Sequence, residues 1–220
     1  KLGARNIKFL GNLKFSQSEN QIMNLDKNLK RLITSRKSWC ASSTHFNEEK
    51  LCGIAHLKLK KKYKDILTII IPRHINRVQS IKKDLNKLDL KVHFDEPKKK
   101  INSDIDIYLV NSYGKTKSFY KVCKNIFLGG SLIPHGGQNP LEAIRYGCRV
   151  LHGPNISNFK EIYYFLKKRQ LSNKVNNLNQ LVTKLDKSLK EKINSKKIIK
   201  NLNNEGSKIL EKTYKEVCKL

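Results

Sequence analysis

The strongest constraint on the fold of this chain is a regular alternation between short apolar runs and helical stretches. Apolar runs of strand length occupy residues 38–42, 66–71, 90–94, 106–110, 125–128 and 149–152. Helical periodicity fills the intervals, at residues 47–63, 76–88, 115–124, 140–146 and 159–168. Apolar strands separated by helices are typical of a parallel sheet covered on both faces. The pattern therefore predicts an α/β fold, a doubly wound Rossmann-like parallel sheet with ligands at the carboxyl ends of its strands.

The chain divides into three parts. Residues 1–35 hold one strand candidate, at residues 7–10, and a polar helical connector, and we expect them to be a lead-in or linker from a missing N-terminal domain. Residues 36–175 carry the alternating pattern and form the predicted Rossmann-like domain. Residues 176–220 have helical periodicity, and we predict helices that cover the core. Their apolar positions are Leu178, Leu181, Val182, Leu185 and Leu189, followed by Ile209, Leu210, Tyr214 and Val217 in a last helix at 205–220.

The charge balance is strongly basic, with 46 Lys and Arg against 18 Asp and Glu. Such an excess suggests polyanionic partners such as nucleic acid or anionic lipid. Only 8 of the 46 cations are Arg, the residue suited to bidentate recognition of phosphate or guanine. The composition therefore favours solvated lysines on helix faces over a nucleic-acid surface, and it is compatible with attraction to an anionic membrane. No apolar run approaches the ~18 residues that a membrane span needs.

Self-contained catalytic or metal sites are not indicated. The five Cys residues show no CxxC or zinc-ligand spacing, and they fit reduced, buried thiols rather than disulfides or a metal site. The six His residues are dispersed, and the chain has no P-loop, GxGxxG or HExxH motif. A self-contained hydrolase or ATPase is disfavoured.

The most informative segment follows the predicted strand at residues 126–128. Gly129, Gly130 and Ser131 end this strand, and glycines at such a position let a ligand or a second backbone approach closely. His135 is the one histidine of the glycine-rich loop that comes next. We therefore expect this loop to line a ligand crevice.

A helix is predicted to begin at the end of that loop. Asn139 is suited to the N-cap, Pro140 to the first helical position, and Glu142 stands three residues beyond the cap, as in a capping box. The free N–H groups of such a helix start suit a phosphate. Glu142 would repel a phosphate, so it should face a hydroxyl pair such as a ribose, unless it only caps its own helix.

Three further loops leave strands at the same predicted edge of the sheet. Arg73 follows the strand at 66–71 and could hold a phosphate bidentately, although a surface Arg at a strand exit is common. His74 and Arg77 are secondary candidates there. Hydroxyls and an imidazole at residues 43–45 precede Glu48 and Glu49, a pattern that helix capping alone also explains. A turn at residues 111–114 completes the set, and the convergence of these loops suggests a nucleotide site.

These motifs, taken in order and spacing, resemble a known family. They are Gly11-Asn12-Leu13-Lys14-Phe15, Ser43-Thr44-His45 with Glu48-Glu49, Pro72-Arg73-His74, Gly129-Gly130-Ser131-Leu132, His135-Gly136-Gly137-Gln138-Asn139-Pro140-Leu141-Glu142, Gly153-Pro154 and Asn158-Phe159. Over about residues 1–185 the chain resembles the carboxyl-terminal half of bacterial lipid A 3-deoxy-D-manno-octulosonic acid (Kdo) transferases. The block at residues 129–142 is the most specific part of this resemblance.

The resemblance implies a two-domain, inverting glycosyltransferase of the GT-B type, of which residues 36–175 would be the CMP-Kdo-binding, C-terminal domain. Such an enzyme transfers Kdo from CMP-Kdo to a lipid A precursor in lipopolysaccharide core biosynthesis. It also implies that the catalytic base and the lipid A precursor site belong to the N-terminal domain, so this chain alone should be inactive. The expected location is the cytoplasmic face of the bacterial inner membrane, against its anionic surface, with no nucleic acid as partner.

The resemblance further assigns the CMP contacts. The implied CMP-binding residues are Pro72, Arg73, Tyr113, Gly114, Lys115, Asn139, Pro140, Leu141 and Glu142. Secondary candidates are Ser43, Thr44, His45, Gly130, Ser131 and His135. No catalytic residue is expected in this chain, and no metal or cofactor apart from the donor substrate CMP-Kdo.

Several positions depart from the family pattern. Lys115 stands where the family usually has Glu, which reverses a charge and leaves backbone contacts as the expected role of this loop. Gln138 replaces a His, and Phe46-Asn47 replaces Glu-Gly. Two alternatives therefore stay open: a GT-B domain that uses another donor, such as a UDP-sugar, and a basic nucleic-acid-binding module.

Overall fold

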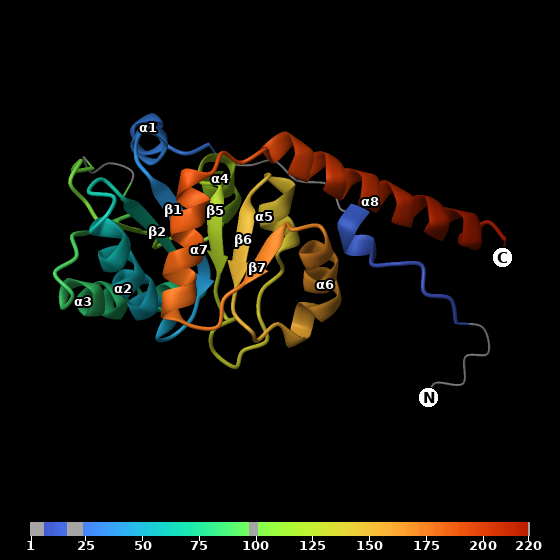
Figure 1. Cartoon of the computed structure of the whole chain (residues 1–220), viewed down its shortest axis with the longest axis horizontal. Coiled ribbons are helices and arrows are strands. Elements are labelled where there is room, and N and C mark those ends of the chain that lie inside the picture. The colour runs from blue at the N-terminus through green and yellow to red at the C-terminus, as the bar shows by residue number, and fades with distance from the viewer. Residues whose placement is uncertain (1–6, 17–23, 97–100, 220) are drawn as a thin grey trace.

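A seven-stranded sheet forms the centre of the molecule (Figure 1). The computed structural model describes residues 7–16, 24–96 and 101–219. The strand order is β3-β4-β2-β1-β5-β6-β7, and every neighbouring pair is parallel. The strands are β1 (Ser38–Thr44), β2 (Leu67–Pro72), β3 (Val92–Phe94), β4 (Ile107–Leu109), β5 (Asn125–Leu128), β6 (Arg149–His152) and β7 (Ser172–Lys174). The predicted doubly wound, Rossmann-like sheet is confirmed.

The strand order reverses between β1 and β5. From β1 the chain forms β2 beside it, then β3 at the edge of the sheet and β4 between β3 and β2, and it then crosses to the other side of β1 to form β5, β6 and β7. The loops after β1 and β5 therefore leave in opposite directions. In sheets of this kind ligands bind where the order reverses, outside the carboxyl ends of the strands.

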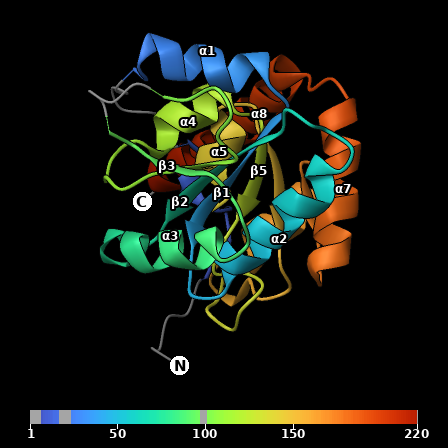
Figure 2. The same ribbon diagram turned by 90° about the vertical axis from the view of Figure 1, so that its left-hand side faces the viewer.

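Helices cover both faces of the sheet (Figures 1 and 2). One apolar core lies beneath α2 (Glu48–Lys60), α3 (Val78–Asn86) and α7 (Leu178–Lys190). The other lies beneath α1 (Lys27–Ser35), α4 (Thr116–Val122), α5 (Leu141–Arg145), α6 (Lys160–Lys168) and α8 (Ser195–Val217). Short 3-10 turns form η1 (Leu13–Ser16), η2 (Ile75–Arg77) and η3 (Ser157–Phe159).

The alternation of side chains along each strand explains why both faces are apolar. In β1, Trp39 and Ala41 point into the α2 side, whereas Cys40 points into the α1 side. All three are fully buried. Consecutive apolar residues of one strand therefore pack against opposite faces of the sheet, which is the pattern that the sequence showed.

The amino-terminal segment differs from the prediction. Residues 7–10 form no strand, and Lys8 instead pairs with Glu216 at the far end of α8. The segment predicted as a lead-in also contributes Phe15, Leu29 and Ile33 to the apolar core on the face of the sheet that α1 and α8 cover. Residues 1–6 and 17–23, which belong to the predicted lead-in, lie outside the described residues.

The carboxyl-terminal helices only partly follow the prediction. Helix α7 buries Leu181, Leu185 and Leu189 against the sheet, as expected. The last helix is one continuous element of 23 residues, and its distal half extends beyond the sheet beside η1 (Figure 1). Of the four apolar positions predicted to cover the core there, Ile209 is buried, and the remaining three are exposed: Leu210, Tyr214 and Val217. That prediction was wrong for those three, because the helix continues past the sheet that it was expected to cover.

One strand was not predicted. Strand β7 has three residues, Ser-Asn-Lys, and no apolar run marks it in the sequence. Its residues pair in register with the edge of β6: Ser172 with Val150, Asn173 with Leu151 and Lys174 with His152.

Candidate functional site

Loops from several strands converge on the carboxyl edge of the sheet. Those after β1 and β5 flank the point where the strand order reverses, and the loop after β2 lies directly beside them. The loop after β4 lies one strand farther out. Helices α4 and α5 pack against each other on one face and both begin at this edge. The predicted site residues therefore lie on one side of the molecule.

Glu48 joins the two central loops. Its buried carboxylate accepts hydrogen bonds from four backbone N–H groups: Oε2 from His45 (3.0 Å) and Gly130 (2.6 Å), and Oε1 from Ser131 (3.1 Å) and Leu132 (3.0 Å). Burial raises the pKa of Glu48, and the four donors partly offset that rise. In the sequence, Glu48 is recognisable only as a residue at the start of a helix. In the structure it fixes the loop after β5 to the end of β1.

The tight turns around this carboxylate explain the glycines. A Cβ on Gly129 would lie 2.5 Å from the carbonyl oxygen of Ser43 and 2.6 Å from Cα of Thr44. Gly130 has a φ of +63°. The Oγ of Ser131 accepts a hydrogen bond from the backbone N–H of Gly153 (2.8 Å), so this hydroxyl is used within the fold.

The hydroxyl residues after β1 have different environments. Ser43 has a φ of 54°, a left-handed conformation at a shift of register in the pairing of β1 with β2. Thr44 is fully buried, and its Oγ1 has no hydrogen-bond partner among the described residues. Neither side chain is shown to face a ligand, and both stay candidates.

Arg73 leaves β2 beside the end of β1. Its backbone N–H donates to the carbonyl oxygen of Thr44 (2.9 Å), which fixes the main chain, while its side chain is exposed. Pro72 is buried as the last residue of β2. Arg77, a secondary candidate, is already engaged by a bidentate ion pair with Glu49, at 3.0 and 3.1 Å. Arg73 is therefore the better placed of the two guanidinium groups to bind a ligand.

Three histidines from three loops meet next to Arg73. The ring of His45 lies 3.9 Å from that of His135 and 5.8 Å from that of His74, centroid to centroid. His45 is buried, whereas the other two are exposed. Burial together with the neighbouring imidazoles and guanidinium groups lowers the pKa of His45 to about 4. His45 is thus a neutral ring at neutral pH.

The loop after β4 is held by Asp95, which the sequence did not single out. Its carboxylate accepts hydrogen bonds from Tyr108 (2.8 Å) and Ser112 (2.9 Å) and pairs with Lys115 (2.7 Å). The charge reversal at Lys115 is therefore balanced within the chain. Tyr113 and Gly114, which precede Lys115 in the predicted site, are exposed, and Gly114 has a φ of +83°.

The helix after the glycine-rich loop begins one residue later than predicted. Asn139 Oδ1 accepts from the backbone N–H of Leu141 (3.0 Å), which is the predicted cap, and Pro140 is assigned just before the five-residue α5. Glu142 does not complete a capping box. It is half-buried, and within the described part of the chain its carboxylate makes no hydrogen bond or ion pair. It is near enough to Tyr120 to raise the pKa of that phenol, after burial and Cys40.

The phenol of Tyr120 links this helix to the central strand. Tyr120 Oη lies 2.7 Å from Oγ of Ser42, near the end of β1. Glu142 and Arg73 therefore lie on either side of the end of β1, at the same edge of the sheet. The arrangement places an exposed guanidinium group, a carboxylate without a partner among the described residues, and the starts of α4 and α5 at the same edge of the sheet.

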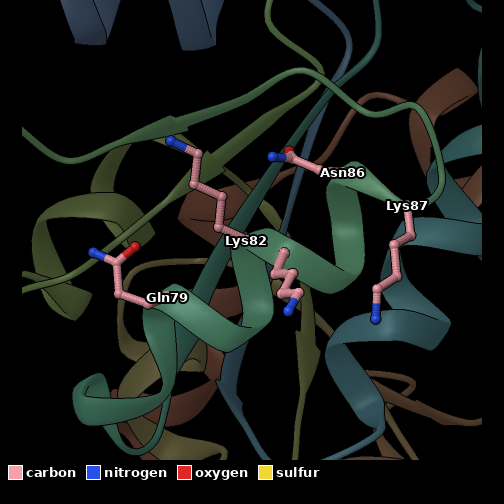
Figure 3. Close-up of a pocket in the computed structure, with 5 residues that line it drawn as sticks. Gln79, Lys82, Asn86 and Lys87 are labelled. Atoms are coloured by element: carbon pink, nitrogen blue, oxygen red, sulfur yellow. The ribbon is translucent and has the colours of Figure 1, made fainter.

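The hollow drawn in Figure 3 is a separate feature. It lies along the outer surface of α3 and is lined by Gln79, Lys82, Lys83, Asn86 and Lys87. Its lining comes from consecutive turns of one helix rather than from several converging loops, so we do not assign it to the site.

The described residues also show how metal-ligating side chains, thiols and apolar helices are distributed. Within residues 7–16, 24–96 and 101–219, no group of three His, Cys, Asp or Glu side chains could hold a metal ion. Four of the five predicted buried thiols are buried, and Cys218 is exposed. Among the described helices, none is both long and apolar enough to cross a membrane.

Comparison with known proteins identifies relatives. No family model matches the chain. The chain is 29% identical over 202 residues to the 3-deoxy-D-manno-octulosonic acid transferase of Haemophilus influenzae, covering 91% of this chain and 47% of that protein. It is 31% identical over 190 residues to the transferase of the same description from Aquifex aeolicus, covering 86% and 50%. The chain thus spans about half the length of the curated relatives it matches.

A solved structure has the same fold. The C-terminal CMP-Kdo binding domain of WaaA from Acinetobacter baumannii superposes with a TM-score of 0.70 at 24% identity, covering 83% of this chain and 93% of that domain. The sequence relatives and this fold agree with the motifs that line the carboxyl edge. The chain is therefore similar to Kdo transferases over about half of their length, and it has the fold of a C-terminal, GT-B-type glycosyltransferase domain.

Proposed function

We propose that this chain is the donor-nucleotide half of a Kdo transferase. In this proposal it binds the CMP part of CMP-Kdo while Kdo is transferred to a lipid A precursor in lipopolysaccharide core biosynthesis. The observation that carries the proposal is the placement of Arg73 and Glu142 on either side of the end of β1, each without a partner for its charged group among the described residues. Two opposite charges with free hydrogen-bonding capacity suit a ligand with a phosphate at one end and hydroxyls at the other.

The residues would divide the donor between them. Arg73 would hold the phosphate, which becomes more negative as CMP leaves, so a guanidinium group there stabilises the developing charge. Glu142 would accept hydrogen bonds from the ribose hydroxyls, beside a helix start formed by Asn139, Pro140 and Leu141. Tyr113, Gly114 and Lys115 would line the nucleoside, with backbone contacts because the Lys115 ammonium already pairs with Asp95.

The remaining parts of the reaction would belong to the half of the related transferases that this chain does not span. A base there would deprotonate the hydroxyl of the lipid A precursor, which attacks the anomeric carbon of Kdo as CMP departs. We expect no metal or cofactor besides the donor. The net charge of +28 favours the anionic cytoplasmic face of the inner membrane as the location.

Calorimetric titration with CMP, UDP and GDP tests the proposal. We expect CMP to bind best, and Arg73→Ala and Glu142→Ala each to weaken CMP binding by about 1–3 kcal/mol, as for a lost hydrogen bond to a charged group. Lys83→Ala, an exposed cation on α3, is the control and should leave the affinity unchanged. A preference for UDP would favour a different nucleotide-sugar donor, and wild-type affinity in both variants would show that the site lies elsewhere.

A further inference from the structure

The three-histidine cluster formed by His45, His74 and His135 has no role in the scheme above. Its members come from the loops after β1, β2 and β5, so only the fold brings them together. His74 directly follows Arg73 in the chain, and His135 belongs to the loop after β5, which lies on the other side of β1 from β2. The cluster therefore lies beside the group to which we assign the phosphate.

The charges around this cluster are unbalanced. The cationic or titratable groups that act on His45 are His135, His74, Arg73 and Arg77. The two nearest carboxylates on the following helix are already used: Glu48 accepts four backbone N–H groups, and Glu49 neutralises Arg77. Arg73 and the two exposed imidazoles are thus left without an anionic partner in the described residues. A guanidinium group and two imidazoles that converge from the loops after β2 and β5, with no carboxylate bound to them in the described residues, indicate an anionic ligand.

The buried ring of His45 is held in place by contacts with Gln138 and Gly130. His45 is 7% exposed, and its Nε2 lies 3.4 Å from Nε2 of Gln138. Because the ring is neutral, its Nε2 can accept a hydrogen bond from that amide. A Cβ on Gly130 would lie 3.1 Å from the ring of His45, so the glycine leaves room for the imidazole. The Gln that replaces the usual family His at 138 therefore supports the buried ring.

We propose that the three-histidine cluster binds the carboxylate of the sugar acid that is transferred, next to the phosphate held by Arg73. This inference rests on the proposed function, because it concerns the sugar part of the same donor. It assigns to His74 and His135 the hydrogen bonds to the carboxylate, and to His45 the positioning of the His135 ring against which it packs.

The chemistry of the donor explains why such a cluster is needed. In a CMP-linked 2-keto sugar acid the anomeric carbon carries both the phosphate ester oxygen and the carboxylate. Two anionic groups are then held side by side, and one guanidinium group cannot neutralise both. Imidazoles can donate to a carboxylate and gain charge as it binds, because a nearby anion raises their pKa. A donor with a neutral sugar would leave this surface without a partner.

Titration with two ligands tests the assignment. The Kd of CMP and that of freshly prepared CMP-Kdo are measured by calorimetry for the wild-type chain, for the double variant His74→Ala/His135→Ala, and for the control Lys83→Ala. Both substituted histidines are exposed, so the fold should tolerate the change. We expect CMP-Kdo to lose about tenfold in affinity in the double variant, as for one lost charged hydrogen bond, while the affinity for CMP changes by less than about threefold. The control should match the wild type.

The outcomes separate the two proposals. If the wild-type chain does not bind CMP, the proposed function fails before the cluster is tested. If CMP binds and the double variant loses the same factor for both ligands, the imidazoles act on the phosphate, and the carboxylate assignment is overturned. An unchanged affinity for both ligands overturns it as well. His135→Gln, which keeps a hydrogen-bond donor but has no imidazole, should give an intermediate loss for CMP-Kdo alone.

Discussion

The Glu48 carboxylate is the contact whose removal should most disturb the candidate site. Replacing it by Gln keeps the shape of the side chain and one acceptor oxygen. The other oxygen becomes an NH₂ group that faces two backbone donors, either those of His45 and Gly130 or those of Ser131 and Leu132. Two buried N–H groups then lose their acceptor, and each costs about 1–3 kcal/mol. We expect Glu48→Gln to destabilise the chain by about 2–6 kcal/mol.

Urea unfolding at pH 7 measures this loss, read as a shift of the midpoint at constant m. Because the expected loss approaches the whole stability of a typical domain, hydrogen exchange of the amides of Gly130, Ser131 and Leu132 provides a second measurement. The matched control is Glu142→Gln, which removes a carboxylate that has no hydrogen bond in the described part of the chain and should cost less than about 0.5 kcal/mol. If both variants unfold at the same urea concentration, the argument that Glu48 joins the two loops is wrong.

Two further predictions concern groups near the site. Burial lowers the pKa of His152 to about 4, so the unfolded chain takes up a proton below pH 6.5 that the folded chain refuses until about pH 4. The free energy of unfolding that His152 contributes is complete above pH 6.5 and falls as the pH drops to 4, by up to about 3 kcal/mol. In urea unfolding between pH 7 and 4.5, His152→Gln should therefore lose less stability with falling pH than the wild type. The same pH dependence in both proteins would contradict a lowered pKa at His152. Lys115→Met and Asp95→Asn should show a coupling energy above about 1 kcal/mol in a double-mutant cycle of urea unfolding, because they form one largely buried ion pair; strictly additive losses would show that the pair does not hold the loop after β4.

The strands of this fold could be predicted because their sequence pattern is local. A parallel strand buried on both faces is mostly apolar, and β1, β2 and β5 each carry that signal in a run of at least three consecutive apolar residues. Strand β7 carries no such signal, since its three residues are polar and owe their conformation to the edge of β6. The segment at residues 7–10 has the opposite property: it is mostly apolar, yet it forms no strand and lies beside α8, where Lys8 pairs with Glu216.

The candidate site divides in the same way. Arg73, Asn139 and Glu142 could be named as candidates from the sequence, because each follows a predicted strand at its carboxyl end and belongs to an ordered set of family motifs. The role of Asp95 could not, since Lys115 is twenty residues away in the chain and only the pairing of β3 with β4 brings the two together.

The sequence by itself determined the fold class, the edge of the sheet at which the candidate residues lie and the family that the chain resembles, because strand length, helical period and loop motifs are all properties of neighbouring residues. Only the tertiary structure decided that Glu48 holds the loop after β5, and that three histidines from three loops share one surface with Arg73. These contacts join residues up to 90 positions apart, from His45 to His135. Their existence depends on the order of strands in the sheet, which no local pattern encodes.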